Sequence, residues 1–101
     1  MNNEKVLNLI GLAMRARKLV LGQDFVLSAL KASPQSIIFL ASDAGDNIVK
    51  KINNKAKTFN ATLVHSFTST ELSKAVGKEN RRVILVTDKG FIKKFNEYLN
   101  S

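Results

Sequence analysis

The 101-residue chain contains no cysteine, which excludes disulfide bonds, thiolate zinc sites and cysteine nucleophiles and fits a reducing cytoplasm. Its single histidine, His65, has no carboxylate among its neighbours to orient it for acid–base chemistry, so we expect a structural or surface role. No apolar run reaches the roughly 20 residues that span a bilayer. The cations near the N-terminus follow the apolar stretch, whereas in a secretory signal they precede it. We therefore expect a cytoplasmic protein with no membrane partner.

Motifs of nucleotide-dependent and metal-dependent enzymes are also missing. Gly77-Lys78 lacks the glycine five positions earlier and the following hydroxyl that a phosphate-binding loop requires, and there is no GxGxxG. Asp43 and Asp46 could hold a metal, but no histidine or third nearby carboxylate joins them. We favour instead a loop in which Asp46 caps the following helix. The sequence thus predicts a non-enzymatic protein with no metal and no cofactor.

The charge balance points toward an anionic partner. Sixteen Lys and Arg residues face eight Asp and Glu, giving a formal net charge of +8. This bias favours nucleic acid first and an anionic membrane surface second. Charge alone also leaves open a surface that is merely soluble and cationic.

The spacing of apolar residues predicts helices that alternate with strands. Helices are expected over 2–18, 23–31, 48–59, 70–76 and 91–99, and strands over 19–21, 36–41, 62–66 and 83–86. The continuous apolar runs SIIFLA and VILV indicate strands buried on both faces, and Ser33-Pro34 indicates a turn. We therefore expect one domain over residues 1–101, of the α/β class, with helices covering both faces of a sheet.

Three loops at strand ends are candidates for a binding site, because such loops tend to meet at one end of an α/β sheet. They are the loop around Gly22, the SDAGD loop and the basic loop 77–82. Gly22 allows the backbone to approach a partner closely, and the amides that open the next helix at Gln23 can donate to phosphate oxygens. The two arginines of the third loop can grip a phosphate or a guanine edge. Each loop alone would also fit an ordinary turn or helix cap.

Three stretches carry a resemblance to a known family: KLVLGQDFVLSAL (18–30), SIIFLASDAGD (36–46) and TSTELSKAVGKENRRVILVTD (68–88). In this order and spacing they resemble the kink-turn-binding ribosomal proteins of the L7Ae/L30e family. The branch of small bacterial YlxQ-like proteins is the most similar, since it shares a RARK-like segment and VTDxGF. The resemblance implies a three-layer α/β/α sandwich around a mixed four-stranded sheet. It also implies binding to a sharply bent RNA internal loop with sheared G·A pairs, read by shape and unstacked bases.

The helix that the resemblance places in the RNA departs from the family pattern. Many members have Gly-x-Asn-Glu and then a lysine three residues after the Glu, where this chain has Asp24, Phe25 and Ser28. Asp24 can accept hydrogen bonds but repels phosphate, Phe25 can stack on a base, and Ser28 carries no charge. A serine, Ser73, also replaces the glycine of the family's ELG segment. The chain therefore either reads a different RNA or binds a kink-turn weakly and relies on its basic residues, which are Lys18, Lys31, Lys78, Arg81 and Arg82.

From the loops and the resemblance together, the candidate RNA-binding residues are Lys18, Gly22, Gln23, Asp24, Phe25, Ser28, Lys31, Asp43, Ala44, Gly77, Lys78, Arg81 and Arg82. We expect a monomer whose partner is structured RNA, either ribosomal RNA or another kink-turn-like RNA, with the ribosome as a further expected partner. The alternative is a docking module of the translation machinery that touches RNA only incidentally, because an exposed Phe25 would also serve a protein interface.

Overall fold

The computed structural model describes residues 2–33 and 35–100, so Pro34 of the expected turn lies outside the described residues. Helices and strands alternate along the chain as predicted. In order they are α1 (Asn3–Arg15), β1 (Leu19–Leu21), α2 (Gln23–Leu30), β2 (Ile37–Leu40), α3 (Asp46–Thr58), β3 (Thr62–Val64), α4 (Ser69–Val76), β4 (Val83–Val86) and α5 (Lys89–Leu99).

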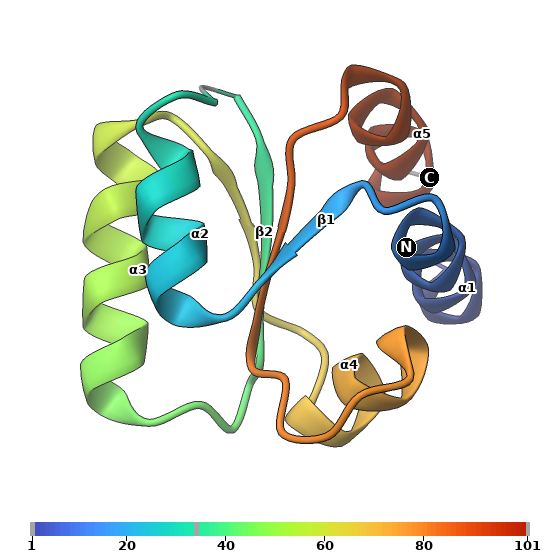
Figure 1. Ribbon diagram of the computed structural model, residues 1–101, viewed down its shortest axis with the longest axis horizontal. Helices are drawn as coiled ribbons and strands as arrows, with labels where there is room; N and C mark the ends of the chain where they lie inside the picture. Colours follow the sequence, from blue (N-terminus) through green and yellow to red (C-terminus); the bar gives the residue numbers. More distant parts are fainter. Residues whose placement is uncertain (1, 34, 101) are drawn as a thin grey trace.

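The strands form one mixed sheet in the order β1-β4-β2-β3. β4 pairs antiparallel with both β1 and β2, whereas β2 pairs parallel with β3. Helices α2 and α3 cover one face of the sheet, and α1, α4 and α5 cover the other (Figure 1). The three-layer α/β/α sandwich with a mixed four-stranded sheet is therefore confirmed.

The two apolar runs are buried because the central strands face a separate core on each side. In β2, Ile37 and Phe39 pack with the α1, α4 and α5 layer, whereas Ile38 and Leu40 pack with the α2 and α3 layer. All four side chains are fully buried. Side chains alternate between the faces of a strand, so a strand between two helical layers must be apolar at every position. β4 follows the same pattern over Val83–Val86.

Several elements are shorter than predicted. α1 ends at Arg15, because Arg17 adopts a left-handed conformation with φ of 59°. The amide of Lys18 then donates to the carbonyl of Ala13 at 2.9 Å, which closes the helix in a Schellman turn. β3 ends at Val64, so His65 lies beyond the strand, and its Nε2 is 2.9 Å from the carbonyl oxygen of Ala41.

The start of α3 corrects one prediction. Gly45 is the N-cap residue, with no side-chain cap hydrogen bond, and Asp46 is the first residue of the helix. Asp46 therefore does not cap α3. Its carboxylate instead lies in the first turn, where a negative charge interacts favourably with the helix dipole. The longest helices have 13 residues, and no helix in the described ranges is long and apolar enough to cross a membrane.

Candidate nucleic-acid interface

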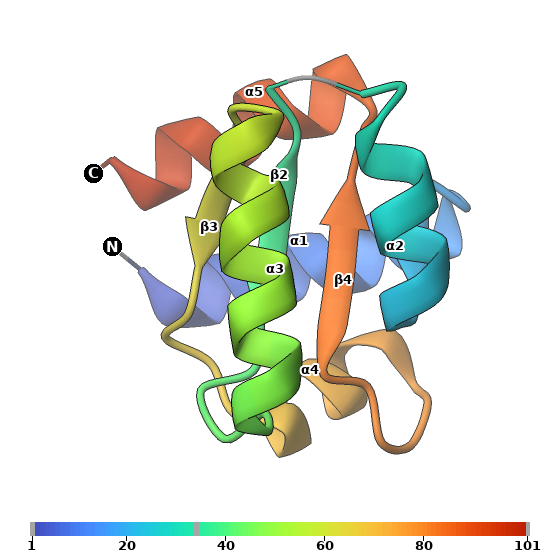
Figure 2. The same ribbon diagram turned by 90° about the vertical axis from the view of Figure 1, so that its left-hand side faces the viewer.

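The three predicted loops meet at one edge of the sheet, the lower edge in Figure 2. The amide of Gly22 donates to the carbonyl of Val83 at 3.3 Å, which joins the end of β1 to the start of β4. The amide of Ala41 donates to the carbonyl of Arg82 at 2.8 Å, which joins the end of β2 to the same loop. Because β4 runs antiparallel to its neighbours, its beginning lies beside their ends.

Two of the helices that begin at this edge have no side-chain cap. α2 starts after Gly22 and α3 after Gly45, and neither glycine offers a hydrogen-bonding side chain. Gly22 has φ of 96° and ψ of 142°. A residue with a side chain would be strained in this conformation. The first amides of a helix lack intrahelical partners. The edge therefore presents amide donors of the kind that bind anions.

The third helix at this edge, α4, is capped and tied to the loop after β2. Both oxygens of Asp43 accept hydrogen bonds from Ser69, one from its amide and one from its hydroxyl, each at 2.8 Å. These bonds hold the pKa of the Asp43 carboxyl below its usual value, and the positive charge of Arg82 acts in the same direction. Thr68 and Glu71 complete a capping box. Asp43 is thus a structural acceptor, and no cluster of metal-ligating side chains occurs among the described residues.

The basic loop after α4 is held in place by backbone geometry and one hydroxyl. Gly77 is left-handed with φ of 70° and ends α4, while Asn80 is left-handed with φ of 56°. The hydroxyl of Ser73 accepts a hydrogen bond from the amide of Arg81 at 2.8 Å and lies 3.4 Å from the carbonyl oxygen of the same residue. Ser73 therefore anchors the loop to α4 at the residue that carries one of the two arginines.

A hollow of about 190 Å³ lies between these loops. It is lined by Gly22, Gln23, Ile48, Asn80, Arg81, Arg82 and Val83. Ile48 provides an apolar surface and the two arginines provide charged donors. The Nε of Arg81 is buried and has no hydrogen-bond partner within the described part of the chain. A hollow with these features can hold a planar group on an apolar wall while a guanidinium donates to its polar edge.

The structure places the candidates of α2 on an exposed surface. Phe25 is 73% exposed, an unusual position for a large apolar side chain, and Asp24 and Ser28 are also exposed. Gln23 lines the hollow. Ala44, in contrast, is half-buried and packs against both apolar cores. Its contribution is therefore to hold the loop after β2 in position.

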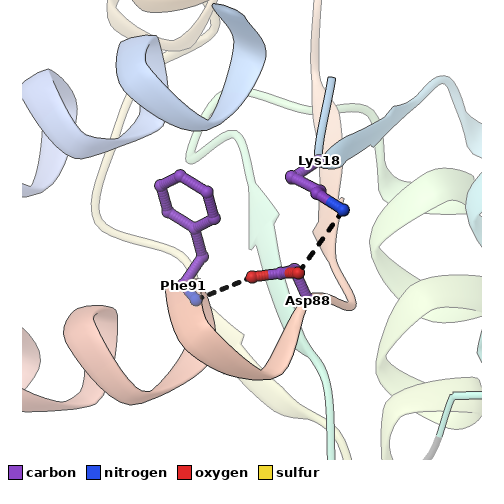
Figure 3. Close-up of polar contacts among 3 residues, drawn as sticks. All are labelled: Lys18, Asp88 and Phe91. Carbon is purple, nitrogen blue, oxygen red and sulfur yellow. Dashed lines mark hydrogen bonds and ion pairs between the residues drawn. The ribbon is translucent and has the colours of Figure 1, made fainter. Parts of the chain in front are cut away.

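Two predicted residues, Lys18 and Lys31, are not brought to this edge. Lys18 lies at the opposite end of β1 from Gly22, and its Nζ is 3.7 Å from a carboxylate oxygen of Asp88 (Figure 3). The other carboxylate oxygen of Asp88 accepts from the amide of Phe91 and caps α5. Lys31 follows the last residue of α2, at the far end of that helix from Gly22.

Three residues at the edge were missed by reasoning from sequence. Ile48 packs against the apolar core of the α2 and α3 layer and also lines the hollow, and its apolar side chain alone does not indicate the second contact. Asn80 carried one signal, because asparagine tolerates the left-handed conformation that it adopts here. Ser73 was visible as a departure from the family pattern, but its partner at Arg81 depends on the path of the loop.

The edge is not uniformly positive. Its cations are Lys78, Arg81 and Arg82, and its carboxylates are Asp24, Asp43, Asp46 and Glu79. A surface that mixes donors and acceptors in this way suits the reading of polar base edges better than simple attraction of phosphates.

Comparison with known proteins assigns the chain to a family. The model of the ribosomal protein L7Ae/L30e/S12e/Gadd45 family matches residues 4–96, and the chain belongs to this family. The predicted resemblance is therefore confirmed. Two relatives are each named RNA-binding protein YlxQ. The one from Enterococcus faecium is 36% identical over 97% of this chain and 94% of its own length. The one from Bacillus subtilis (strain 168) is 35% identical over 91% of this chain and 92% of its own length.

Two solved structures are similar to the whole fold. A protein described as having unknown function, from Bacillus halodurans C, is 34% identical, with a TM-score of 0.88 over 96% of this chain and 98% of that one. The 15.5kD RNA binding protein of Giardia lamblia has a TM-score of 0.80 over 99% of this chain and 91% of that one. At 14% identity this second likeness shows the fold alone.

Proposed function

We propose that this protein binds structured RNA and recognises a sharply bent, kink-turn-like internal loop with the edge formed by its three loops. The observation that carries the proposal is the hollow between Gly22, Ile48 and the two arginines, beside two helix starts without side-chain caps. A base extruded from a bent loop would rest against Ile48, with Arg81 and Arg82 at its polar edge. The first amides of α2 would donate hydrogen bonds to a phosphate of the bend.

The mixed charge of the edge supports recognition by shape. A regular duplex offers mainly phosphates to a protein, which favours a uniformly basic surface. A bent loop instead exposes unstacked bases with both donors and acceptors. Exposed carboxylates such as those of Asp24 and Glu79 can accept hydrogen bonds from base amino groups.

The relatives support the RNA-binding part of this proposal. Two proteins that align with more than nine-tenths of this chain are named RNA-binding proteins. The family and these names also support the prediction that the chain is a non-enzymatic protein. We extend the proposal to a cytoplasmic monomer that binds ribosomal RNA, since the family description names ribosomal proteins. Co-sedimentation with ribosomal particles in a sucrose gradient tests this extension, and a protein that stays at the top of the gradient contradicts it.

A titration of two RNAs tests the proposal. One RNA carries the kink-turn, and the other is identical except that its G·A pairs are replaced by Watson–Crick pairs, which removes the bend. We expect clearly tighter binding to the bent RNA in a gel-shift assay. Equal and weak binding to both RNAs would refute kink-turn recognition and leave only general affinity for RNA.

Replacement of both loop arginines tests the contacts themselves. The double substitution Arg81→Ala/Arg82→Ala should weaken binding to the bent RNA. It should also reduce the slope of log K against log salt by roughly 0.7 to 0.9 for each phosphate contact that is lost. A weaker affinity with an unchanged slope would indicate that the arginines contact bases and not phosphates, and an unchanged affinity would exclude both from the interface.

A second candidate function is docking to another protein, with RNA contact only incidental. The exposed Phe25 favours it, because aromatic side chains are frequent anchors in protein interfaces. Purification of the tagged protein from lysate treated with ribonuclease separates the two functions. Under the RNA-binding proposal, specific partners are lost with the RNA. A partner that remains after nuclease treatment and is released by Phe25→Ala would support docking.

A further inference from the structure

The edge of the sheet at which the three loops meet, here named the reading edge, does not account for the strong positive charge of the chain. Its three cations are outnumbered by its four carboxylates. The excess lies elsewhere, in part on the α2 and α3 layer. After Asp46, the first residue of α3, residues 47–60 contain four lysines and no acidic residue. They are Lys50, Lys51, Lys55 and Lys57, and all four are exposed. We name these four residues the α3 lysine ridge.

Among the described residues, none forms an ion pair with a lysine of the ridge. The ion pairs of the described residues are Lys18–Asp88 and Lys94–Glu97, and neither involves α3. Lys51 and Lys55 are four residues apart on the helix, where like charges destabilise it by a few tenths of a kcal/mol. The two lysines of the last turn, Lys55 and Lys57, interact favourably with the helix dipole. That benefit falls off within one turn, so it does not explain Lys50 and Lys51.

The ridge begins beside the hollow and leads away from it. α3 starts at the edge where the loops meet and extends to the opposite end of the molecule (Figure 2). Ile48 lines the hollow, Lys51 follows it by three residues on the same side of the helix, and Lys55 follows one turn later. At 1.5 Å per residue, Lys55 lies roughly 10 Å along the helix axis from Ile48. The positive charge therefore continues in one direction from the proposed base-binding hollow.

We propose that the α3 lysine ridge binds the phosphate backbone of an RNA stem that leaves the bent loop. The inference rests on the proposed function, because the hollow fixes where the RNA starts. The edge then reads the shape and bases of the bend, whereas the ridge supplies affinity that depends on salt and on stem length but not on sequence. Phosphates suit this surface, because exposed lysines on flexible stems act as point charges and do not require a fixed geometry.

Two RNAs with the same bent loop test whether the edge and the ridge have these separate roles. One RNA has full stems, and the other has both stems trimmed to a few base pairs. The substitution Lys51→Gln/Lys55→Gln should weaken binding to the long RNA by roughly tenfold and lower its salt slope by about two. It should leave binding to the trimmed RNA unchanged. The matched control is Lys89→Gln/Lys93→Gln, an exposed pair with the same spacing on α5, across the sheet. The control should affect neither RNA.

The outcomes separate the two proposals. Failure of the wild-type protein to prefer the trimmed bent RNA over a straight one would refute the proposed function, and the inference with it. Normal binding of the trimmed RNA, together with no effect of Lys51→Gln/Lys55→Gln on the long RNA, would overturn the inference alone. If Lys51→Gln/Lys55→Gln leaves RNA binding unchanged but abolishes binding to vesicles that contain anionic lipid, the inference is overturned and the ridge binds a membrane surface instead. Matched melting curves by circular dichroism establish that the variants are folded.

Discussion

Phe25 lies in the first turn of α2 with most of its ring in solvent. Substitution of an exposed side chain changes stability little, so Phe25→Ala should unfold at nearly the same urea concentration as the wild type. A ring that stacks on an unpaired base contributes about 1–3 kcal/mol to binding. We therefore expect Phe25→Ala to bind the bent RNA roughly 5-fold to 150-fold more weakly in a fluorescence titration, and Phe25→Tyr to retain most of the affinity.

The substitution Phe25→Glu provides the contrasting outcome, because it restores the residue of many kink-turn binders. A glutamate can accept hydrogen bonds from a guanine edge but cannot stack. If Phe25→Glu binds as well as or better than the wild type, the family's hydrogen-bonding mode still operates here, and the stacking role of Phe25 is wrong.

Gly22 and Gly45 form a matched pair of glycines at helix starts. Gly22 has φ of 96°, where an added side chain strains the backbone. Gly45 has φ of −65° and no atom within 4 Å of an added Cβ. Gly22→Ala should therefore lose roughly 1–3 kcal/mol of unfolding free energy in urea, while Gly45→Ala should lose clearly less. Equal losses would mean that the conformation of Gly22 is not the reason for glycine at that position.

At the scale of elements, the sequence predicted the type and order of the helices and strands, because these depend on the local spacing of apolar residues. The continuous apolar runs of β2 and β4 were identified because both strands are buried between two helical layers. The ends of elements were less predictable, because they depend on hydrogen bonds whose partners are distant in sequence. The amide of Ser42, for example, donates to the carbonyl of Phe67 just beyond the end of β2, and no periodicity in the sequence indicates that contact.

The candidate site also has features that the sequence predicts and features that it does not. The convergence of the three loops was predictable, because loops at strand ends tend to meet at one end of an α/β sheet. The placement of Lys18 was not, since its contact with Asp88 depends on the antiparallel pairing of β1 with β4. The antiparallel pairing places the start of β1, where Lys18 lies, beside the end of β4 and Asp88. Both lie at the end of the sheet opposite the three loops.

The link between α4 and the basic loop can be tested at Ser73. Ser73→Ala removes the hydroxyl that binds the amide of Arg81. This half-buried bond should contribute about 1 kcal/mol. We expect faster hydrogen exchange at the Arg81 amide and faster dissociation of the RNA, with association little changed. Exchange at wild-type rates would show that the backbone turn at Gly77 holds the loop without the hydroxyl.

The link between the loop after β2 and α4 gives a pH-dependent prediction. The pKa of Asp43 is lowered in the folded protein by the two bonds from Ser69. A lowered folded pKa adds stability above the unfolded value, near 3.8, and this stability is lost as pH falls through the lower folded value. Asp43→Asn should thus be less stable than the wild type at neutral pH, and the difference should shrink below about pH 4. Urea unfolding across a pH series measures this, and a difference independent of pH would contradict it.

At the scale of the whole molecule, the sheet separates two surfaces with different roles. The α2 and α3 layer begins at the reading edge and carries the α3 lysine ridge. The α1, α4 and α5 layer mixes cations with carboxylates such as Glu4, Glu71 and Glu97. Because the two layers have separate apolar cores on opposite faces of the sheet, RNA can follow one layer without contact with the other. We therefore expect RNA to contact the α2 and α3 layer and to leave the α1, α4 and α5 layer free.

An NMR titration of backbone amides with kink-turn RNA tests directly whether the three loops bind a bent RNA. The largest shifts should fall at residues 22–25, 43–46 and 77–82, with smaller shifts along α3 and little change along α5. The RNA with replaced G·A pairs should produce much smaller shifts at the three loops. Shifts that concentrate on α1 or α5, or that are the same for both RNAs, would contradict recognition of a bent RNA by this edge.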